Sequence, residues 1–181
     1  LADLQKQYED MPENFMPNLM RKKREHKAVG YSYKFDGNPP NPKYNKDQWS
    51  SLTDGLYWTY NSYVTPPVDT WLGFRENDCE LILRLLETDF EQIGINCFQN
   101  PSSWIYYPEN IEIYTSENTI DFELIETIEF VNDYRDGIQV FRTSKKPRNA
   151  TYIKVKMKGL EAIPEGRPGA GELPWVFFDE V

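Results

Sequence analysis

The sequence has little of the two residue types on which most small enzymes and metal sites depend. It contains one histidine and two cysteines in 181 residues. A Ser-His-Asp triad could use only His26, which lies in the charged run 21–27, whereas a triad needs a buried and oriented imidazole. Cys79 and Cys97 are too few for a disulfide framework or a Cys-rich zinc site. We expect both cysteines to be free thiols.

Long apolar runs and an excess of positive charge are also missing. No stretch approaches the roughly 18 apolar residues of a membrane span. The chain carries 20 Lys and Arg against 29 Asp and Glu, a formal net charge of -9. Nucleic-acid binding requires a basic surface, and anionic lipid head groups repel an acidic chain. We therefore expect no nucleic-acid partner and no membrane insertion. The polar first ten residues do not read as a signal peptide, and we expect a mature protein or an excised fragment.

Aromatic residues, in contrast, are abundant. Hydrophobic residues make up 39% and aromatic residues 15% of the chain, with 12 Tyr, 10 Phe and 5 Trp. This is too much aromatic carbon for a disordered chain, so a packed core is expected. The high aromatic content also predicts that some rings lie on the surface.

The first 28 residues differ in pattern from the rest. Leu1, Leu4 and Tyr8 have helical spacing, and a second short helical stretch is predicted over 18–27. We interpret 1–28 as a helical linker or extension that packs on a neighbour. A basic interaction patch is the alternative interpretation of its Lys and Arg residues.

From residue 29 onward the apolar residues alternate with polar ones. Ile153, Val155 and Met157, for example, alternate with lysines, which is typical of a half-buried strand. Turn signals rich in Gly, Pro, Asn and Asp separate the segments. The predicted strands are 81–85, 93–97, 111–114, 122–130, 137–143, 153–158 and 175–181. Residues 29–181 are therefore predicted to form an all-β antiparallel sandwich or jelly roll.

Enzyme motifs are not found. A Gly-rich phosphate loop between a strand and a helix is missing, and so is the G-x-S-x-G elbow. Carboxylates are plentiful, but nothing singles out two of them as a glycosidase pair. We expect a protein that is not itself an enzyme. A small independent hydrolase remains an alternative.

The sequence gives stronger indications of a ligand-binding site than of an enzyme active site. Trp104 and Tyr106 follow the turn 101–103, and a flat ring there can stack on the C–H face of a pyranose. Sugar hydroxyls also need planar polar partners, which we assign to Arg75, Asn100 and Arg167. The alternatives are that the rings belong to the core and that the polar residues form a solvated loop surface. For Trp71 and Trp175 the core is the favoured interpretation.

One turn could hold a calcium ion. Calcium is bound by six to eight oxygens, often on a tight turn. The segment 52–59 offers Asp54 and Thr59, and Asp179 with Glu180 could close the site from the last strand. An Asp-Gly pair is more often simply a turn.

Several short motifs, taken together with their order along the chain, resemble those of a known domain family. The sequence resembles the coagulation factor 5/8 type C (discoidin) domain from about residue 29 to the C-terminus. It is particularly similar to the versions at the C-termini of β-N-acetylhexosaminidases of the chitobiase type from Bacteroidetes. The carrying motifs are Asn41-Pro42-Lys43-Tyr44, Ser51-Leu52-Thr53-Asp54-Gly55, Thr70-Trp71-Leu72-Gly73-Phe74, Cys97-Phe98-Gln99, Ser103-Trp104-Ile105 through Tyr107-Pro108, and Gly166-Arg167-Pro168-Gly169-Ala170-Gly171 with Trp175 through Val181.

The resemblance implies a galactose-binding-like jelly roll of about eight strands. It implies a non-catalytic carbohydrate-binding module, similar to carbohydrate-binding module family 32, beside the catalytic domain of a larger bacterial glycoside hydrolase. Such a module would be monomeric and secreted, periplasmic or on the cell surface. It would bind terminal galactose or N-acetylhexosamine sugars. The alternative is a structural or protein-interaction spacer that packs on the parent enzyme without binding sugar.

The resemblance also implies a structural calcium ion. At one position, Arg167, the sequence departs from the family pattern. The implied ligands are the carboxylates of Asp54 and Glu180, an oxygen of Thr59, and the carbonyls of Ser51, Leu56 and Asp179. Relatives often carry histidine where Arg167 stands. Arg167 can donate hydrogen bonds but cannot accept them, so the resemblance does not determine which monosaccharide is preferred.

Overall fold

The structure is a computed structural model that describes residues 22–23, 25–45, 52–58, 71–75, 78–86, 90–129, 132–147 and 150–181. All structural statements below concern these residues. The helix predicted for the first residues lies outside them, and so do Ser51 and Thr59.

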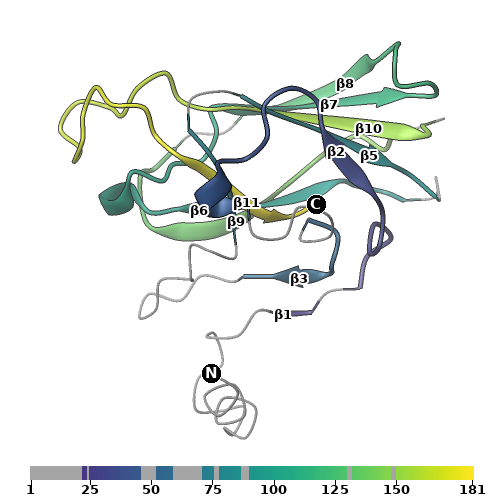
Figure 1. Cartoon of the computed structure of the whole chain (residues 1–181), viewed down its shortest axis with the longest axis horizontal. Coiled ribbons are helices and arrows are strands. Elements are labelled where there is room, and N and C mark those ends of the chain that lie inside the picture. The colour runs from purple at the N-terminus through teal and green to yellow at the C-terminus, as the bar shows by residue number, and fades with distance from the viewer. Residues whose placement is uncertain are drawn as a thin grey trace, which may run out of the picture.

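Two antiparallel sheets pack face to face (Figure 1). The five-stranded sheet has the order β2 (Tyr33–Phe35), β5 (Cys79–Arg84), β10 (Tyr152–Lys158), β7 (Asn110–Ser116), β8 (Glu123–Glu129). The four-stranded sheet has the order β4 (Leu72–Phe74), β11 (Val176–Glu180), β6 (Gly94–Gln99), β9 (Gly137–Arg142). A small ribbon pairs β1 (Lys22–Lys23) with β3 (Leu56–Tyr57), below the four-stranded sheet in Figure 1. Two 3₁₀ turns are η1 (Pro42–Tyr44) and η3 (Pro101–Ser103).

The strands follow the alternation of the sequence. In β10, Ile153, Val155 and Met157 are buried, while the three lysines between and after them are only half-buried. Salt bridges on the outer face join Lys154 and Lys156 to Glu80 of the neighbouring β5. The predicted all-β sandwich is confirmed, and each of the seven predicted strands is present with small shifts at its ends.

Four short strands, β1 to β4, were not predicted. β2 and β4 contain three residues each, too few to show alternation. β4 depends on its central glycine, because a Cβ on Gly73 would lie 2.4 Å from the Phe177 ring of the neighbouring β11. The pairing of β4 with β11 therefore requires glycine at this position.

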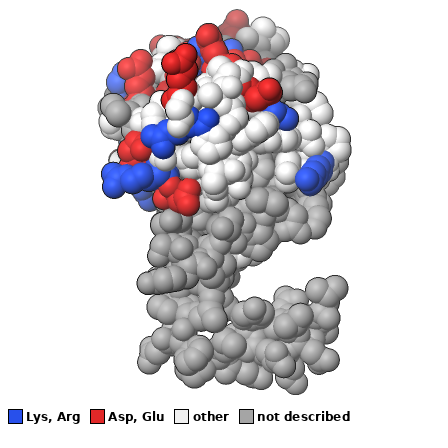
Figure 2. Space-filling view, turned by 90° about the vertical axis from the view of Figure 1, so that its left-hand side faces the viewer, with Lys and Arg blue, Asp and Glu red and all other residues white. Residues whose placement is uncertain are grey.

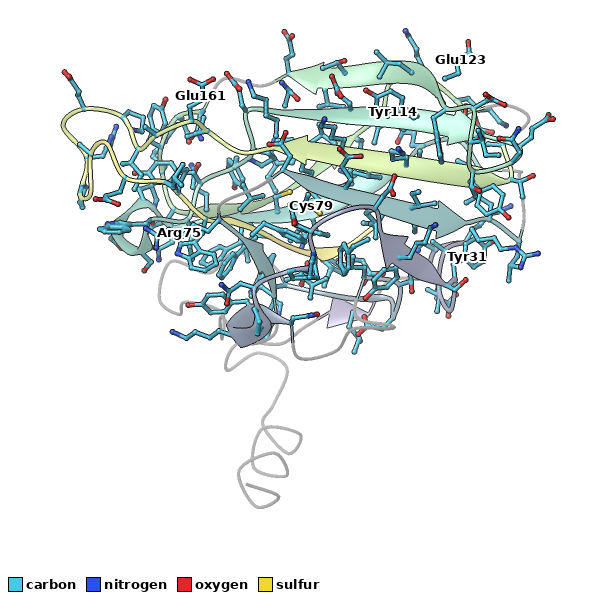
Figure 3. All side chains as sticks on the ribbon, turned by 45° about the horizontal axis from the view of Figure 1, so that its top comes forward. Tyr31, Arg75, Cys79, Tyr114, Glu123 and Glu161 are labelled. Atoms are coloured by element: carbon cyan, nitrogen blue, oxygen red, sulfur yellow. The ribbon has the colours of Figure 1, made fainter. Side chains whose placement is uncertain are left out.

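The core has two parts. The larger part lies between the sheets and contains residues such as Leu81, Ile95 and Phe178. Cys79 and Cys97 lie within it, are fully buried and are not bonded to each other, as predicted. Burial raises the pKa of both thiols well above the ordinary value, which makes them unreactive. Figure 3 labels Cys79 in the middle of the sandwich.

The smaller part of the core is a separate cluster formed by Trp71, Phe98, Ile105 and Phe177. Trp71 stacks on Phe98 with ring centroids 5.2 Å apart and is 1% exposed. The interpretation of Trp71 as a core residue is confirmed.

The N-terminal segment differs from the prediction. Lys22 and Lys23 form strand β1, and residues 27–30 form a turn, so the helix predicted over 18–27 is wrong where the structure describes it. Tertiary contacts determine this conformation, because His26 Nε2 lies 2.5 Å from Glu180 Oε1 and Gly30 N donates to the Thr53 carbonyl. The domain boundary at residue 28 stays a prediction. Among the described residues, no helix is both long and apolar enough to cross a membrane.

Edge strand β8 is tied to the β9–β10 connection by one carboxylate. Glu126 accepts hydrogen bonds from Ser144 N, the Ser144 hydroxyl and Lys145 N, at 2.8 to 3.1 Å. Burial raises the pKa of Glu126, but these hydrogen bonds lower it by more, and the pKa lies below its ordinary value. The ionised form is therefore the one that the fold stabilises.

Replacing this carboxylate by an amide is expected to make stability less dependent on pH. Because the pKa of Glu126 is lower in the folded state, its contribution is complete above its unfolded pKa and is lost as the pH falls through the folded value. Glu126→Gln should cost about 1 kcal/mol at neutral pH, since partial exposure weakens charged hydrogen bonds. Urea denaturation at pH 7 and pH 3 measures the difference between the two proteins. An equal difference at both pH values would contradict this account.

Candidate functional site

Three loops that are far apart in sequence meet at one end of the sandwich. They follow β4, β6 and β10, and they contain Arg75, residues 100–109 and residues 159–175 respectively. Figure 1 shows η3 and the loop before β11 together at the left. Figure 3 labels Arg75 and Glu161 at the same end. Long loops at one end of a rigid sandwich commonly carry its binding residues.

Trp104 is held in an unusual backbone conformation by the turn that precedes it. It follows η3 with a left-handed φ of 62°, a region that costs a non-glycine residue about 1–2 kcal/mol. Its N–H donates to the Pro101 carbonyl, and its own carbonyl accepts from Trp175 N. The surrounding structure thus fixes a strained residue, as is common at functional sites.

Asn100 builds this turn instead of facing a ligand. Its Oδ1 accepts from the Ser102 hydroxyl at 2.6 Å and from Ser103 N at 3.1 Å. The residue is 8% exposed. Its acceptor oxygen is thus used to cap η3, and the hydrogen bond from Asn100 to sugar hydroxyls stays a prediction.

Trp104 forms part of a cluster that we call the indole–arginine cluster: Arg75, Trp104, Gly169 and Trp175. The Arg75 guanidinium lies 5.5 Å from the Trp104 ring and 5.6 Å from the Trp175 ring, within cation–π range. Its Nε donates to the Leu173 carbonyl at 3.1 Å. The Arg75 side chain is 31% exposed, and both tryptophans are half-buried. The cluster therefore presents partly exposed, fixed rings beside a positive charge.

Gly169 sets the position of the Trp104 ring. A Cβ on Gly169 would lie 2.4 Å from an indole carbon of Trp104. Gly169 has a φ of +80°, while hydrogen bonds between Ile163 and Gly171 or Glu172 close the base of its loop. The indole thus rests directly on backbone that only glycine can supply.

Tyr106 belongs to a second group of side chains at this end, together with Tyr134 and Arg167. Its ring is fully buried and packs edge-on against Tyr134, with centroids 6.0 Å apart. The Arg167 guanidinium lies 5.0 Å from the Tyr134 ring. Burial raises the pKa of Tyr106, and Arg167 offsets part of that shift. The predicted stacking of a sugar on Tyr106 is wrong, because Tyr134 and its neighbours cover the ring.

The structure therefore brings together part of the predicted set. Arg75 and Trp104 are in contact, whereas Arg167 is exposed and lies with Tyr134. The sequence reasoning assigned Trp175 to the core and overlooked Tyr134. The glycines at 166, 169 and 171 indicated a loop in the sequence, but the contact of Gly169 with Trp104 depends on the tertiary structure.

Figure 2 looks onto this end, with charged side chains of both signs toward the top and left, a further basic patch at the right, and uncharged surface between them. Within the site, the Arg75 guanidinium lies 3.9 Å from a carboxylate oxygen of Glu172. Such a surface suits an uncharged ligand with both apolar and hydrogen-bonding groups.

The predicted calcium ligands lie toward the opposite end. Glu180 Oε2 is buried and has no hydrogen-bond partner, while Oε1 accepts from Gly55 N and contacts His26. Asp54 Oδ1 accepts from Leu56 N at 2.7 Å. The unpartnered oxygen beside Asp54 is compatible with a cation. However, the described residues contain no group of three or more His, Cys, Asp or Glu that could hold a metal.

Comparisons with known proteins were made at three levels. No family model and no curated protein matches the chain. Among solved structures, the chain is similar to CpGH89CBM32-5 from Clostridium perfringens in complex with GalNAc-β-1,3-galactose. The identity is 12% and the TM-score 0.43, over 82% of this chain and 95% of that one.

Two further solved structures are similar at the same level. Chitosan-binding module 1 of a Paenibacillus chitosanase/glucanase has 13% identity and a TM-score of 0.41, over 86% of this chain and 98% of that one. CBM32-3 from a Clostridium perfringens family 31 glycoside hydrolase has 12% identity and a TM-score of 0.42, over 82% and 91%.

Proposed function

We propose that this protein is a non-catalytic carbohydrate-binding module and that the indole–arginine cluster is its sugar site. The observation that carries the proposal is the partly exposed Trp104 ring, fixed in place by Gly169 and Arg75. A rigid ring offers its face to the C–H face of a pyranose without loss of side-chain freedom on binding. Arg75 and Arg167 supply donors for sugar hydroxyls.

The sugar class and context follow from the family resemblance. We propose terminal galactose or N-acetylhexosamine as the ligand, and a secreted, periplasmic or cell-surface bacterial glycoside hydrolase of the chitobiase type as the parent enzyme. The module would act as a monomer. A shallow site that buries little ligand area gives weak affinity, which suits repeated attachment to a glycan surface.

Titration of the protein with galactose, N-acetylgalactosamine and N-acetylglucosamine tests the proposal. We expect binding of at least one sugar with Kd of about 1 mM or tighter, corresponding to about -4 kcal/mol. Trp104→Ala should remove it, while the matched control Tyr114→Phe should not, since Tyr114 lies on the five-stranded sheet and bonds Glu112. No binding of any of the three sugars would overturn the proposal.

The alternative function is a structural spacer that packs on the parent catalytic domain. The burial of Asn100 and Tyr106 favours it, because two predicted ligand residues serve the loop structure instead. On this alternative, the unmodified protein binds none of the three sugars, and Trp104→Ala lowers only its stability. Calorimetry and thermal unfolding of the same variant therefore separate the two functions.

We also propose that calcium binds Glu180 through its unpartnered Oε2, with Asp54, Leu56 and Asp179 as further ligands. Ser51 and Thr59 are assigned to the same site by the resemblance. A bound ion would join the 52–58 turn to strand β11 and would raise stability by mass action. We expect EDTA to lower the Tm of the calcium-saturated protein by several degrees, which corresponds to a loss of about 1–3 kcal/mol in the free energy of unfolding. Glu180→Gln should abolish the difference, and a Tm unaffected by calcium would exclude the site.

A further inference from the structure

The aromatic surface of the proposed sugar site extends beyond Trp104. The Arg75 guanidinium that contacts Trp104 also contacts Trp175, at 5.6 Å from its ring centroid. Trp175 packs edge-on against Tyr44, with ring centroids 4.9 Å apart and an interplanar angle of 84°. All three rings are half-buried, and Tyr44 and Trp175 pack against the smaller part of the core. A connected series of partly exposed rings, Trp104, Trp175 and Tyr44, therefore leads from the indole–arginine cluster to η1.

Tyr44 is held at this place by strand β4. Asn41 N donates to the Gly73 carbonyl at 2.9 Å, and a Cβ on Gly73 would lie 3.0 Å from the Tyr44 Cβ. Arg75 directly follows the last residue of β4, so the same strand positions Tyr44 and Arg75. The Tyr44 ring also rests on the Phe177 ring of β11, with centroids 4.9 Å apart, and Figure 1 shows η1, in dark blue, beside β11. The ring is therefore fixed before a ligand binds, which lowers the entropic cost of binding.

The surroundings of Tyr44 repeat those of Trp104. Each ring has a cationic side chain beside it. The Arg75 guanidinium lies 5.5 Å from the Trp104 ring, and Lys43 Nζ lies 5.2 Å from the Tyr44 ring. Lys43 is exposed. A flat apolar face next to an N–H donor suits a pyranose, which has a C–H face and hydroxyl oxygens that accept hydrogen bonds. The series therefore contains two places with the chemistry that binds a sugar residue.

The spacing along the series suits two linked sugars. Neighbouring groups are separated by 4.9 to 5.6 Å, steps comparable with the width of one pyranose ring. In the described part of the chain, no ring contact joins Trp104 directly to Tyr44. A sugar stacked on Trp104 thus reaches Arg75, whereas the sugar linked to it reaches Trp175 and Tyr44.

We propose that Trp175 and Tyr44 form a second sugar subsite, so that the preferred ligand is a chain of at least two linked sugars. The terminal sugar stacks on Trp104, and the adjoining sugar lies against Trp175 and Tyr44. Arg75 donates to hydroxyls of both sugars, and Lys43 donates to those of the second. This inference rests on the proposed function and adds to it the length of the glycan that the site recognises.

Calorimetric titration with matched pairs of sugars tests the second subsite. Each monosaccharide is compared with a disaccharide in which it is the terminal, non-reducing residue. The disaccharides are N-acetyllactosamine for galactose, N-acetylgalactosamine-β-1,3-galactose for N-acetylgalactosamine, and chitobiose for N-acetylglucosamine. We expect at least one disaccharide to bind at least about fivefold more tightly than its monosaccharide, a difference of about 1 kcal/mol. In two-dimensional NMR spectra, the backbone amide signals of Lys43 and Tyr44 should shift with that disaccharide and not with the monosaccharide.

Tyr44→Leu is the variant that isolates the subsite. Leucine keeps apolar packing on Phe177 but lacks a flat ring, so the advantage of the disaccharide should disappear while the affinity for the monosaccharide stays unchanged. Tyr44→Phe keeps the ring and should keep the advantage. Tyr114→Leu is the matched control, because it removes a half-buried tyrosine ring from the five-stranded sheet, away from the site. Thermal unfolding of each variant checks that it is folded.

The outcomes separate this inference from the proposed function. Equal affinity for each monosaccharide and its disaccharide, or an advantage that persists in folded Tyr44→Leu, would overturn the second subsite and leave the site at Trp104 standing. Unchanged amide signals of Lys43 and Tyr44 with the bound disaccharide would overturn it even where Tyr44→Leu does not fold. If no saccharide of either length binds, the proposed function itself is wrong, and the subsite with it.

Discussion

Gly169→Ala is expected to reduce sugar affinity by about tenfold or more, equivalent to about 1.4 kcal/mol or more of binding free energy. The added Cβ would lie 2.4 Å from the Trp104 indole, so the ring must move from the position that Gly169 and Arg75 define. Movement of the stacking face removes the contact that carries the proposed function. Calorimetric titration with the sugar that binds the unmodified protein measures the loss.

The control for this variant is Gly166→Ala in the same loop. Gly166 has a φ of +78°, close to the +80° of Gly169, but a Cβ there would meet nothing within 4 Å. Both variants therefore carry the same backbone strain, about 1–2 kcal/mol, and only one disturbs Trp104. Gly166→Ala should bind sugar normally. Equal affinity of the two variants would show that the Trp104 ring does not hold the sugar.

Trp71→Ala is expected to cause the largest loss of stability, about 3–5 kcal/mol, the range for removing a large buried aromatic side chain. Trp71 is 1% exposed and stacks on Phe98 in the smaller cluster of the core. Chemical denaturation measures the free energy of unfolding. A loss below about 1 kcal/mol would mean that this cluster collapses around the gap or contributes little.

Trp71→Phe is the matched comparison. The indole Nε1 of Trp71 is buried without a hydrogen-bond partner, so phenylalanine removes an unsatisfied donor and keeps most of the stacking ring. We expect a loss of about 1–2 kcal/mol, smaller than for alanine because the cavity is smaller. A loss as large as that of alanine would indicate that Nε1 makes a hydrogen bond in solution.

Strand positions could be predicted because each long strand has one buried face. Residues such as Ile153 and Val155 alternate with lysines, and a strand with that pattern can bury only one set of side chains. The N-terminal segment could not be predicted in the same way. Its pattern around Lys22 favours a helix locally, but pairing with β3 and the contact of His26 with Glu180 impose an extended chain.

The candidate site shows where sequence reasoning ends. Trp104 and Tyr106 are two residues apart and follow the same turn, so local sequence treats them alike. In the structure Tyr106 is covered by Tyr134, whereas Trp104 rests on Gly169 and remains partly exposed. The covering residues come from different loops, and their positions depend on strand order.

The all-β class, the seven long strands and the position of Trp104 in a loop could be read from the sequence alone. These follow from side-chain alternation and turn residues, which act over a few positions. Which rings reach the surface and which amides are used up in turns depend on the tertiary structure. Exposure is a property of contacts between distant segments, and a linear pattern does not encode which segments will meet.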